Sequence, residues 1–327
     1  MIKYIVRQTL TWLIRIFVAV NLTYLVAAWF LNPASNYAER RPPLSQAQIQ
    51  QMLRPYNLST DVPLVVRWWR WLTDVLVHWN WGYSPVGDSV NGQISYRAGV
   101  SAQLMLGATI LAFVIGIALG VYQASRQYKV GDRIVQIISI FALNTSVVVV
   151  AVVVVYIAIR INRAVGDRIF YVTGAATANL TGFWPIAIDK AQHLILPSIC
   201  LIIISFATYA MMQRSLLLDN LNADYVRTAR AKGLKLSVAI RRHALRTSMI
   251  PVMVSLAFSI PGIFTGAILT ETIFAWNGMG NYLFTTIYKN DINGAVAVAA
   301  FAALMTAIGA VLSDFFVVWL DPRVRVS

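Results

Sequence analysis

The sequence predicts an all-α integral membrane protein with six transmembrane helices, and two observations carry this prediction. Hydrophobic side chains make up 58% of the 327 residues and charged side chains only 12%, whereas about 25% of residues are charged in an ordinary soluble protein. Stretches free of Lys, Arg, Asp and Glu also recur, and each reaches the roughly 20 residues that cross a bilayer as a helix. We expect the spans at 16–38, 98–125, 134–159, 191–213, 247–270 and 292–313.

The distribution of cations decides the number and orientation of these spans. The stretch 169–188 is also free of charge, but its Gly, Pro, Thr and Asn residues make it too polar to insert unaided, so we expect an external loop or an interfacial segment. With six spans and an internal N-terminus, 16 of the 27 Lys and Arg residues lie on the cytoplasmic side. Because cations concentrate in cytoplasmic loops, this arrangement is favoured, and both termini are expected in the cytoplasm.

The first span has a basic entry at Lys3, Arg7 and Arg15 and is expected to be an uncleaved helix, because its apolar run is too long for a signal-peptide core. The segment after it is rich in Pro and Trp, and residues 64–78 read as an amphipathic helix lying on the membrane. Its tryptophans are either anchors at the bilayer surface, which is the commoner use, or part of a ligand site. They are Trp68, Trp69, Trp71, Trp79 and Trp81.

The second and third spans are expected to form a close pair, because only Arg126 to Arg133 separates them. Gly107, Gly116 and Gly120 supply small surfaces for tight helix packing in lipid. The run 147–155 is almost entirely valine and would favour a strand in water, but an isolated strand leaves its backbone unsatisfied in a bilayer, so we expect helix.

The fourth and sixth spans contain few ionisable groups. His193 opens the fourth span and is either a proton-relay group or an interfacial residue at the helix start; the expected span offers it no carboxylate partner. Asp314 is expected near the cytoplasmic end of the sixth span, either paired or in water. Cys200 lies in an apolar run and is expected to be a small buried hydrophobic residue.

The largest polar interruption in the second half of the chain runs from Asp224 to Arg246. Its first part reads as a helix that Gly233 ends, with alanines on one face and cations on another, and a second basic helix is expected from about Leu236. Two interpretations fit this segment. It is either a positively charged loop that sets orientation or a docking element, and the helix–glycine–helix pattern favours the second.

This segment carries a resemblance to a known family. The tract Asp224-Tyr225-Val226-Arg227-Thr228-Ala229-Arg230-Ala231-Lys232-Gly233, with Arg242-His243-Ala244-Leu245-Arg246 after it, resembles the membrane permease subunits of ABC importers for oligopeptides and dipeptides. The wider superfamily has Glu-Ala-Ala, three residues, then Gly. This chain keeps Ala229 and Gly233 but has Arg227 and Thr228 in the other two positions, so the match is to the peptide branch. Residues 95–327 resemble the family well and residues 1–20 weakly.

The resemblance implies the type I ABC importer permease fold in a bacterial or archaeal cell membrane. It divides the chain into an N-terminal segment with the first helix (1–38), an extracytoplasmic loop (39–97) that helps receive the substrate-binding protein, and a core transmembrane domain (98–327). The expected partners are a second homologous permease, two ATPase subunits that hold ATP and Mg, an extracytoplasmic substrate-binding protein and the lipid bilayer. The cargo is oligopeptides or dipeptides, with nickel or glycans as the alternative within the same class.

In that family the cytoplasmic loop, here 214–246, docks on the ATPase. The residues expected to take part in this coupling are Asp224, Tyr225, Arg227, Thr228, Ala229, Arg230, Ala231, Lys232, Gly233, Leu234 and His243.

The fifth span carries the helix breakers Pro251, Pro261, Gly262 and Gly266, and bent helices often line substrate paths. We therefore expect candidates for the translocation path among Pro261, Gly262, Glu271 and Asn277. Glu271 is expected either at the outer interface or at the mouth of a cavity. Residues 271–280 also resemble a family tract, although the family commonly has proline where this chain has Asn277.

Several other functions are disfavoured by what the sequence lacks. It contains no phosphate-binding loop of the Gly-x-x-x-x-Gly-Lys-Ser/Thr type and no HExxH, CxxC or serine-nucleophile motif, so we expect no enzyme activity and no cofactor bound by this chain. The net charge of +14 is concentrated in loops and does not suggest nucleic-acid binding. A secondary transporter would need inverted repeats and buried acid or His partners, and neither is evident.

Overall fold

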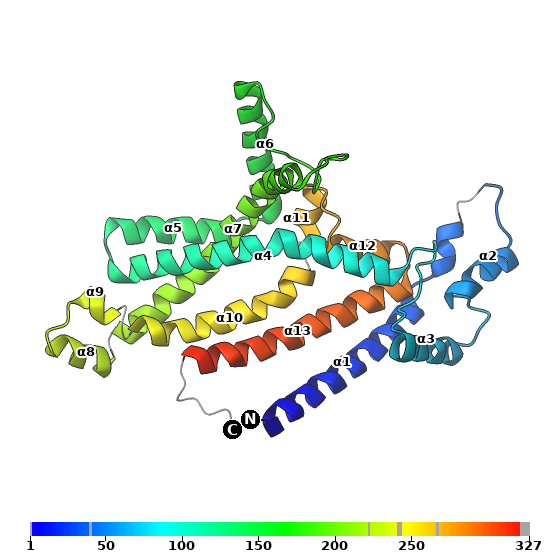
Figure 1. Ribbon diagram of the computed structural model, residues 1–327, viewed down its shortest axis with the longest axis horizontal. Helices are drawn as coiled ribbons and strands as arrows, with labels where there is room; N and C mark the ends of the chain where they lie inside the picture. Colours follow the sequence, from blue (N-terminus) through cyan, green and yellow to red (C-terminus); the bar gives the residue numbers. More distant parts are fainter. Residues whose placement is uncertain (1, 39–40, 222, 241–243, 266–267, 321–327) are drawn as a thin grey trace. The chain divides into compact units, whose positions relative to one another are not determined.

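The computed structural model describes residues 2–38, 41–221, 223–240, 244–265 and 268–320, and the regular elements within them are helices (Figure 1). One isolated bridge pairs Tyr83 with Ser89. The elements are α1 (Ile2–Phe30), η1 (Pro33–Tyr37), α2 (Gln46–Leu53), η2 (Arg54–Tyr56), α3 (Leu64–His78), α4 (Val90–Ser125), α5 (Val130–Asn144), α6 (Val147–Val165), α7 (Phe183–Leu221), α8 (Asp224–Ala231), α9 (Leu236–Ala239), α10 (Leu245–Thr265), α11 (Ile268–Ile273), α12 (Met279–Tyr288) and α13 (Ile292–Leu320).

Six of these helices are long and apolar enough to cross a membrane, which confirms the predicted all-α fold with six spans. Their apolar segments cover Arg7–Phe30, Val90–Ser125, Val147–Val165, Phe183–Leu221, Leu245–Ile263 and Ile292–Leu320. The valine run in α6 is helical, as the backbone argument requires. The predicted amphipathic helix is α3, with the expected bounds of 64 and 78.

Two of the expected spans are too long, because local polar groups end helices that composition alone would continue. The first span does not reach residue 38, because α1 ends at Phe30. Asn32 then caps the short helix η1 by accepting a hydrogen bond from the Ala34 N–H (3.2 Å), and Pro33, whose ring disfavours a helical residue before it, separates η1 from α1. The expected helix over 134–159 is two helices. Ser146 caps α6 by accepting from the Val148 N–H (3.3 Å), and Thr145 is extended.

The stretch 169–188 is also divided. Residues 166–182 form a loop without regular helix, in line with the expected external loop or interfacial segment, while 183–188 are the first turns of α7. The fourth span therefore begins at Phe183 and not at 191. Asp189 and Lys190, which precede the expected span, are thus helical residues.

One compact unit of the chain comprises residues 1–101, 264–268 and 277–307. Its buried core joins α1, α3 and the N-terminal part of α13. Tyr24 of α1 stacks on Trp71 of α3 with ring centroids 4.6 Å apart, and the Trp68 Nε1–H donates to the Asn21 side chain (2.7 Å). Three of the five clustered tryptophans, Trp68, Trp71 and Trp81, therefore pack within the chain, a use that neither sequence interpretation included.

The other unit comprises residues 102–263, 269–276 and 308–327. In it α5 and α6 both contact α7. The predicted close packing by small residues is confirmed at two of the three glycines for which it was expected. A Cβ at Gly116 would lie 2.5 Å from the Tyr209 Cβ, and one at Gly120 would lie 2.6 Å from the Ala210 carbonyl oxygen, whereas Gly107 faces open space.

Candidate functional site

The candidate site is centred on α8, the short helix that follows α7. Asp224 in its first turn and Arg230 in its last turn suit the helix dipole. Gly233 ends it at φ +87°, as predicted. The Gly233 N–H donates to the Arg230 carbonyl (2.9 Å) and the Leu234 N–H to the Ala229 carbonyl (3.3 Å), which is the glycine-dependent stop of the Schellman type.

The inner face of α8 is held by apolar contacts. Val226 is fully buried and Ala229 is 7% exposed. Val226 belongs to a cluster with residues from the ends of α4 and α7 and from the chain after α8: Ala124, Leu217, Ala239, Ile240 and Ala244. The helix α8 is therefore packed against the ends of α4 and α7 and is not a free loop.

The outer face of α8 is polar and open. Tyr225 is 43% exposed, its hydroxyl donating to Asn220 (2.5 Å), and the Asp224 and Arg227 side chains are 99% and 71% exposed. Thr228, Arg230, Ala231 and Lys232 are exposed as well. The expectation that the alanines share one face is wrong: at 100° per residue Ala229 and Ala231 point about 200° apart, so Ala229 is buried and Ala231 stands among the cations.

The second basic helix, predicted from about Leu236, is helical in the residues that the structure describes. Leu236–Ala239 form α9, Ile240 and Ala244 are helical as well, and α10 begins at Leu245. His243, one of the expected coupling residues, lies outside the described residues. Arg246 has another use than docking, because its Nε–H donates to the Leu320 carbonyl (2.7 Å) and so satisfies a terminal carbonyl of α13.

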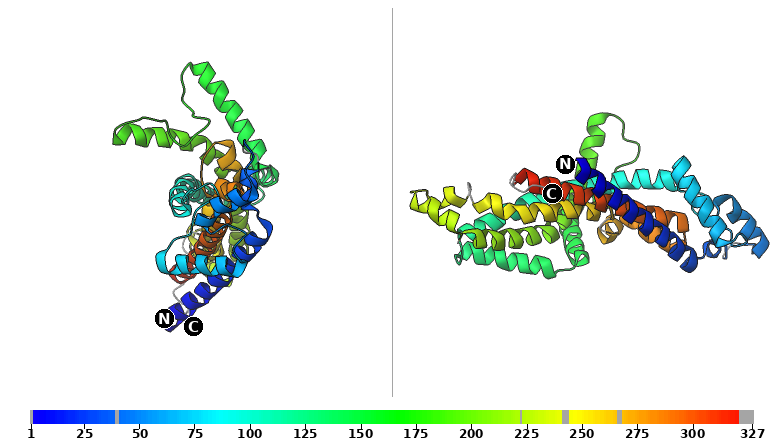
Figure 2. Two further views of the ribbon diagram at one scale, coloured as in Figure 1. Left: turned by 90° about the vertical axis from the view of Figure 1, so that its right-hand side faces the viewer. Right: turned by 90° about the horizontal axis from the view of Figure 1, so that it is seen from below.

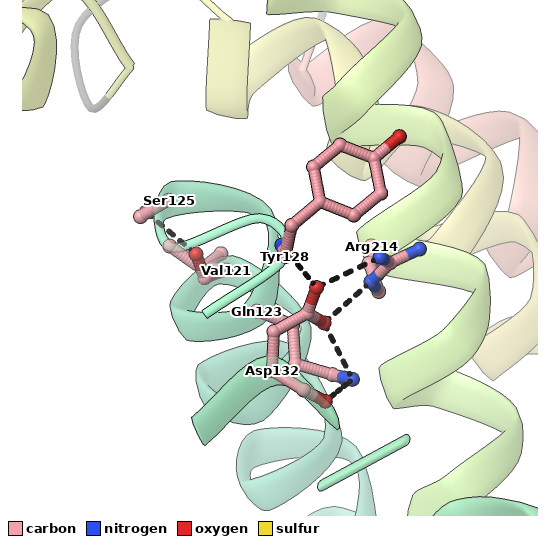
Figure 3. A network of polar contacts seen from close by, with 6 residues as sticks. All are labelled: Val121, Gln123, Ser125, Tyr128, Asp132 and Arg214. Atoms are coloured by element: carbon pink, nitrogen blue, oxygen red, sulfur yellow. Dashed lines mark hydrogen bonds and ion pairs between the residues drawn. The ribbon is translucent and has the colours of Figure 1, made fainter. Parts of the chain in front are cut away.

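A buried ion pair fixes the helices that carry α8 (Figure 3). Arg214 of α7 binds the Asp132 carboxylate of α5 through two parallel hydrogen bonds, Nε to Oδ1 at 2.8 Å and Nη2 to Oδ2 at 3.0 Å. The Tyr128 N–H donates to the same carboxylate (3.0 Å), as does the Gln123 amide (3.3 Å). The Arg214 guanidinium, above all, holds the pKa of the Asp132 carboxyl below its usual range.

This pair connects three helices near the point where α8 begins. Asp132 starts α5, Gln123 ends α4, and Arg214 lies in the last turns of α7. One residue before Arg214, the Gln213 amide donates to the Ser248 hydroxyl of α10 (2.9 Å). The ends of α4, α5, α7 and α10 are thus tied by polar contacts that sequence reasoning did not identify.

The candidates for the translocation path lie on several elements. Pro261 is half-buried inside α10, where Gly309 of α13 packs on it, and Gly262 is exposed. Glu271 is fully buried in α11 and not open as expected. Asn277 is exposed and belongs to the other compact unit.

His193 has a partner that the sequence interpretation excluded. Because α7 starts at Phe183, Asp189 lies one turn before His193 in the same helix, with its Oδ2 3.5 Å from the histidine Nδ1. Tyr171 stacks on the imidazole at 4.2 Å, and Thr177 donates to the carboxylate through its N–H (2.7 Å) and its hydroxyl (2.5 Å). His193 is thus buried beneath loop 166–182 and does not stand at an interfacial helix start. Asp314 is half-buried on α13.

Comparison with known proteins now decides the family. The family model described as binding-protein-dependent transport system inner membrane component matches residues 116–326, which include α8 and the Asp132–Arg214 pair. The chain belongs to this family. The resemblance found in the sequence is thereby confirmed, and with the six apolar helices it identifies a multi-pass integral protein of the bacterial cell membrane.

Individual relatives extend the likeness over the whole chain. The oligopeptide transport system permease protein OppB of Mycobacterium tuberculosis is 34% identical over the full length of both chains. The oligopeptide transport system permease protein AppB of Bacillus subtilis is 30% identical over 87% of each chain. The probable D,D-dipeptide transport system permease protein DdpB of Escherichia coli is 31% identical over 82% of each. These are membrane components of transport systems, and the family is not one of enzymes.

Proposed function

We propose that this chain is the permease subunit of an ATP-driven importer, forms half of the translocation pathway for oligopeptides or dipeptides, and couples to separate ATPase subunits through α8. The observation that carries the proposal is the construction of α8. Its apolar face is held by α4 and α7, its polar face is open, and it lies within the region that matches the family.

The coupling follows from how α8 is attached. When the two partner ATPases close on ATP, the groove of the ATPase that holds α8 would displace this helix. The contacts of Val226 with Leu217 and of Arg214 with Asp132 pass this displacement to α7 and to the α4–α5 turn, and the Gln213–Ser248 hydrogen bond passes it to α10. The spans then tilt together and open a cavity whose other wall is a second permease subunit.

Further observations support an orientation and a cargo. The cations around α8 support a cytoplasmic location for it and for both termini, and an outer location for the loop after α1, where a substrate-binding protein would deliver its load. Peptide cargo is supported by the names of the relatives, and the oligopeptide permease OppB of Mycobacterium tuberculosis matches this chain over its full length. ATP and Mg would be held by the ATPase subunits.

The test is uptake driven by ATP in vesicles that contain the assembled importer. Ala231→Arg places a bulky cation on the open face of α8 without touching the buried contacts, and it should abolish peptide uptake while the subunit stays inserted and α8 loses its binding to the ATPase. Ala178→Arg, the same change at an exposed alanine of loop 166–182, is the matched control and should leave ATPase binding intact. Full uptake by Ala231→Arg would refute coupling through this face.

A further inference from the structure

The helix α3 has three faces, and only two of them are explained by the fold. Its inner face packs on α1 through side chains such as Trp71, Leu72 and Val75. A second face is apolar but open: it consists of Val65 (70% exposed), Val66 (39%), Trp69 (58%), Leu76 (66%) and Val77 (73%). At 100° per residue these five side chains fall within one sector about 120° wide, which also contains the half-buried Thr73.

The third face is polar and borders the open apolar sector. It contains Arg70, Asp74 and His78, all exposed, with His78 Nδ1 3.6 Å from the Asp74 carboxylate. An amphipathic helix that simply covered the core would turn this polar face, and nothing else, away from the protein. The apolar sector of α3 therefore requires an apolar neighbour beyond the described chain.

The position of α3 along α1 indicates what that neighbour is. Its contacts with α1 are made by Asn21 and Tyr24, in the last third of a helix that spans the membrane (Figures 1 and 2). From Asn21 to Phe30 the helix rises about 14 Å, which is close to the thickness of one leaflet of the hydrocarbon core. The same stretch of α1 exposes Leu22, Val26 and Trp29. Since these side chains face lipid, α3 lies at the depth of lipid as well.

We infer that the open apolar face of α3 is inserted into the leaflet at the C-terminal end of α1, as an interfacial membrane anchor. Trp69 is inserted with the rest of the apolar sector, while Trp79, which is 68% exposed in the turn after α3, stands at the level of the headgroups. The aliphatic stem of Arg70 lies along the apolar sector and its guanidinium reaches the phosphates, while Asp74 and His78 face water. The anchor rests on membrane insertion alone and does not depend on peptide transport or on ATPase coupling.

The contact can be measured with a spin label, because the chain has a single cysteine, Cys200, which is buried in α7 and can be replaced by alanine. In that background Leu76→Cys carries a nitroxide, and the assembled importer is reconstituted in vesicles of phosphatidylethanolamine and phosphatidylglycerol. Collisions with oxygen, which concentrates in lipid, and with a water-soluble nickel chelate are then compared. Asp74→Cys, half a turn away on the polar face, is the matched control.

We expect oxygen to reach the label at Leu76 and the nickel chelate to be excluded from it, with the opposite result at Asp74. Nickel access at both positions would show that the face is in water. Exclusion of both reagents at Leu76, together with an immobilised label, would show that a partner protein covers it. Either result overturns the inference. Val65, three turns earlier in the same sector, gives a second site should Leu76→Cys fail to assemble.

Discussion

The ion pair between Asp132 and Arg214 gives the sharpest test of how the base of α8 is held. In Asp132→Asn the shape of the side chain is kept, but the guanidinium of Arg214 loses the carboxylate that accepts its two hydrogen bonds. Breaking a buried pair by removing one partner costs about 3–5 kcal/mol. The Asp132 side chain is 2% exposed but that of Arg214 is 19% exposed, so water can partly replace the lost partner, and we expect the lower end, about 3 kcal/mol.

Such a loss is large enough to measure directly. It corresponds to a factor of about 150 in the unfolding equilibrium, and for a unit of this size it should lower the melting temperature by about 6–12 °C. The assay is thermal unfolding of the purified chain in detergent, followed by circular dichroism. Arg133→Gln, which removes an exposed cation next to Asp132, is the control and should stay within about 0.5 kcal/mol of the parent. Equal melting temperatures for Asp132→Asn and the parent would refute the reasoning that this pair fixes α5 to α7.

The remaining predictions concern other parts of the chain. Gly233→Ala should cost about 1–2 kcal/mol in the same melting assay, because φ is +87° there, whereas Gly233→Pro should also abolish ATP-driven uptake; wild-type uptake would argue against the helix stop. Gly116→Leu should prevent α4 from packing on α7 and lower the yield of folded chain, while Gly107→Leu, which has open space, should not. Glu271→Gln should reduce uptake if the carboxylate serves the translocation path, and unchanged uptake would remove it from that path. Burial raises the pKa of Asp291 to about 6, so its contribution to stability should be complete below about pH 4 and fall as the pH rises to about 6. Asp291→Asn should flatten the melting temperature across that window, and an unchanged pH profile would contradict the assignment.

The sequence allowed a close prediction wherever a local rule decides the structure. Membrane spans follow from apolar length, α3 from its periodicity, and the end of α8 from Gly233, whose left-handed backbone no other residue type adopts as readily. The break before α6 was missed although Ser146 was a visible signal. A serine followed by an apolar run is a typical helix cap, but it was overlooked because its neighbours made the whole stretch look long enough to span.

The candidate site was predicted only where its residues are contiguous. Arg214 and Asp132 are 82 positions apart, and a single sequence does not say which of 27 cations a given carboxylate binds. The same limit explains His193: its partner Asp189 is a close neighbour, but the partnership depends on α7 starting at Phe183, and helix boundaries are the least certain part of any such prediction. The two faces of α8 were confused for a related reason, because eight residues give little more than two turns over which to recognise a pattern.

The proline inside α7 has a consequence for which part of that helix can move as one rod. Pro197 removes a backbone hydrogen bond from the helix interior and bends it, so the stretch 197–221 is the straight part that leads to α8. At 1.5 Å per residue this stretch is about 36 Å long. A tilt of about 10° around its midpoint would displace its C-terminal end by about 3 Å, and the start of α8 would move with it.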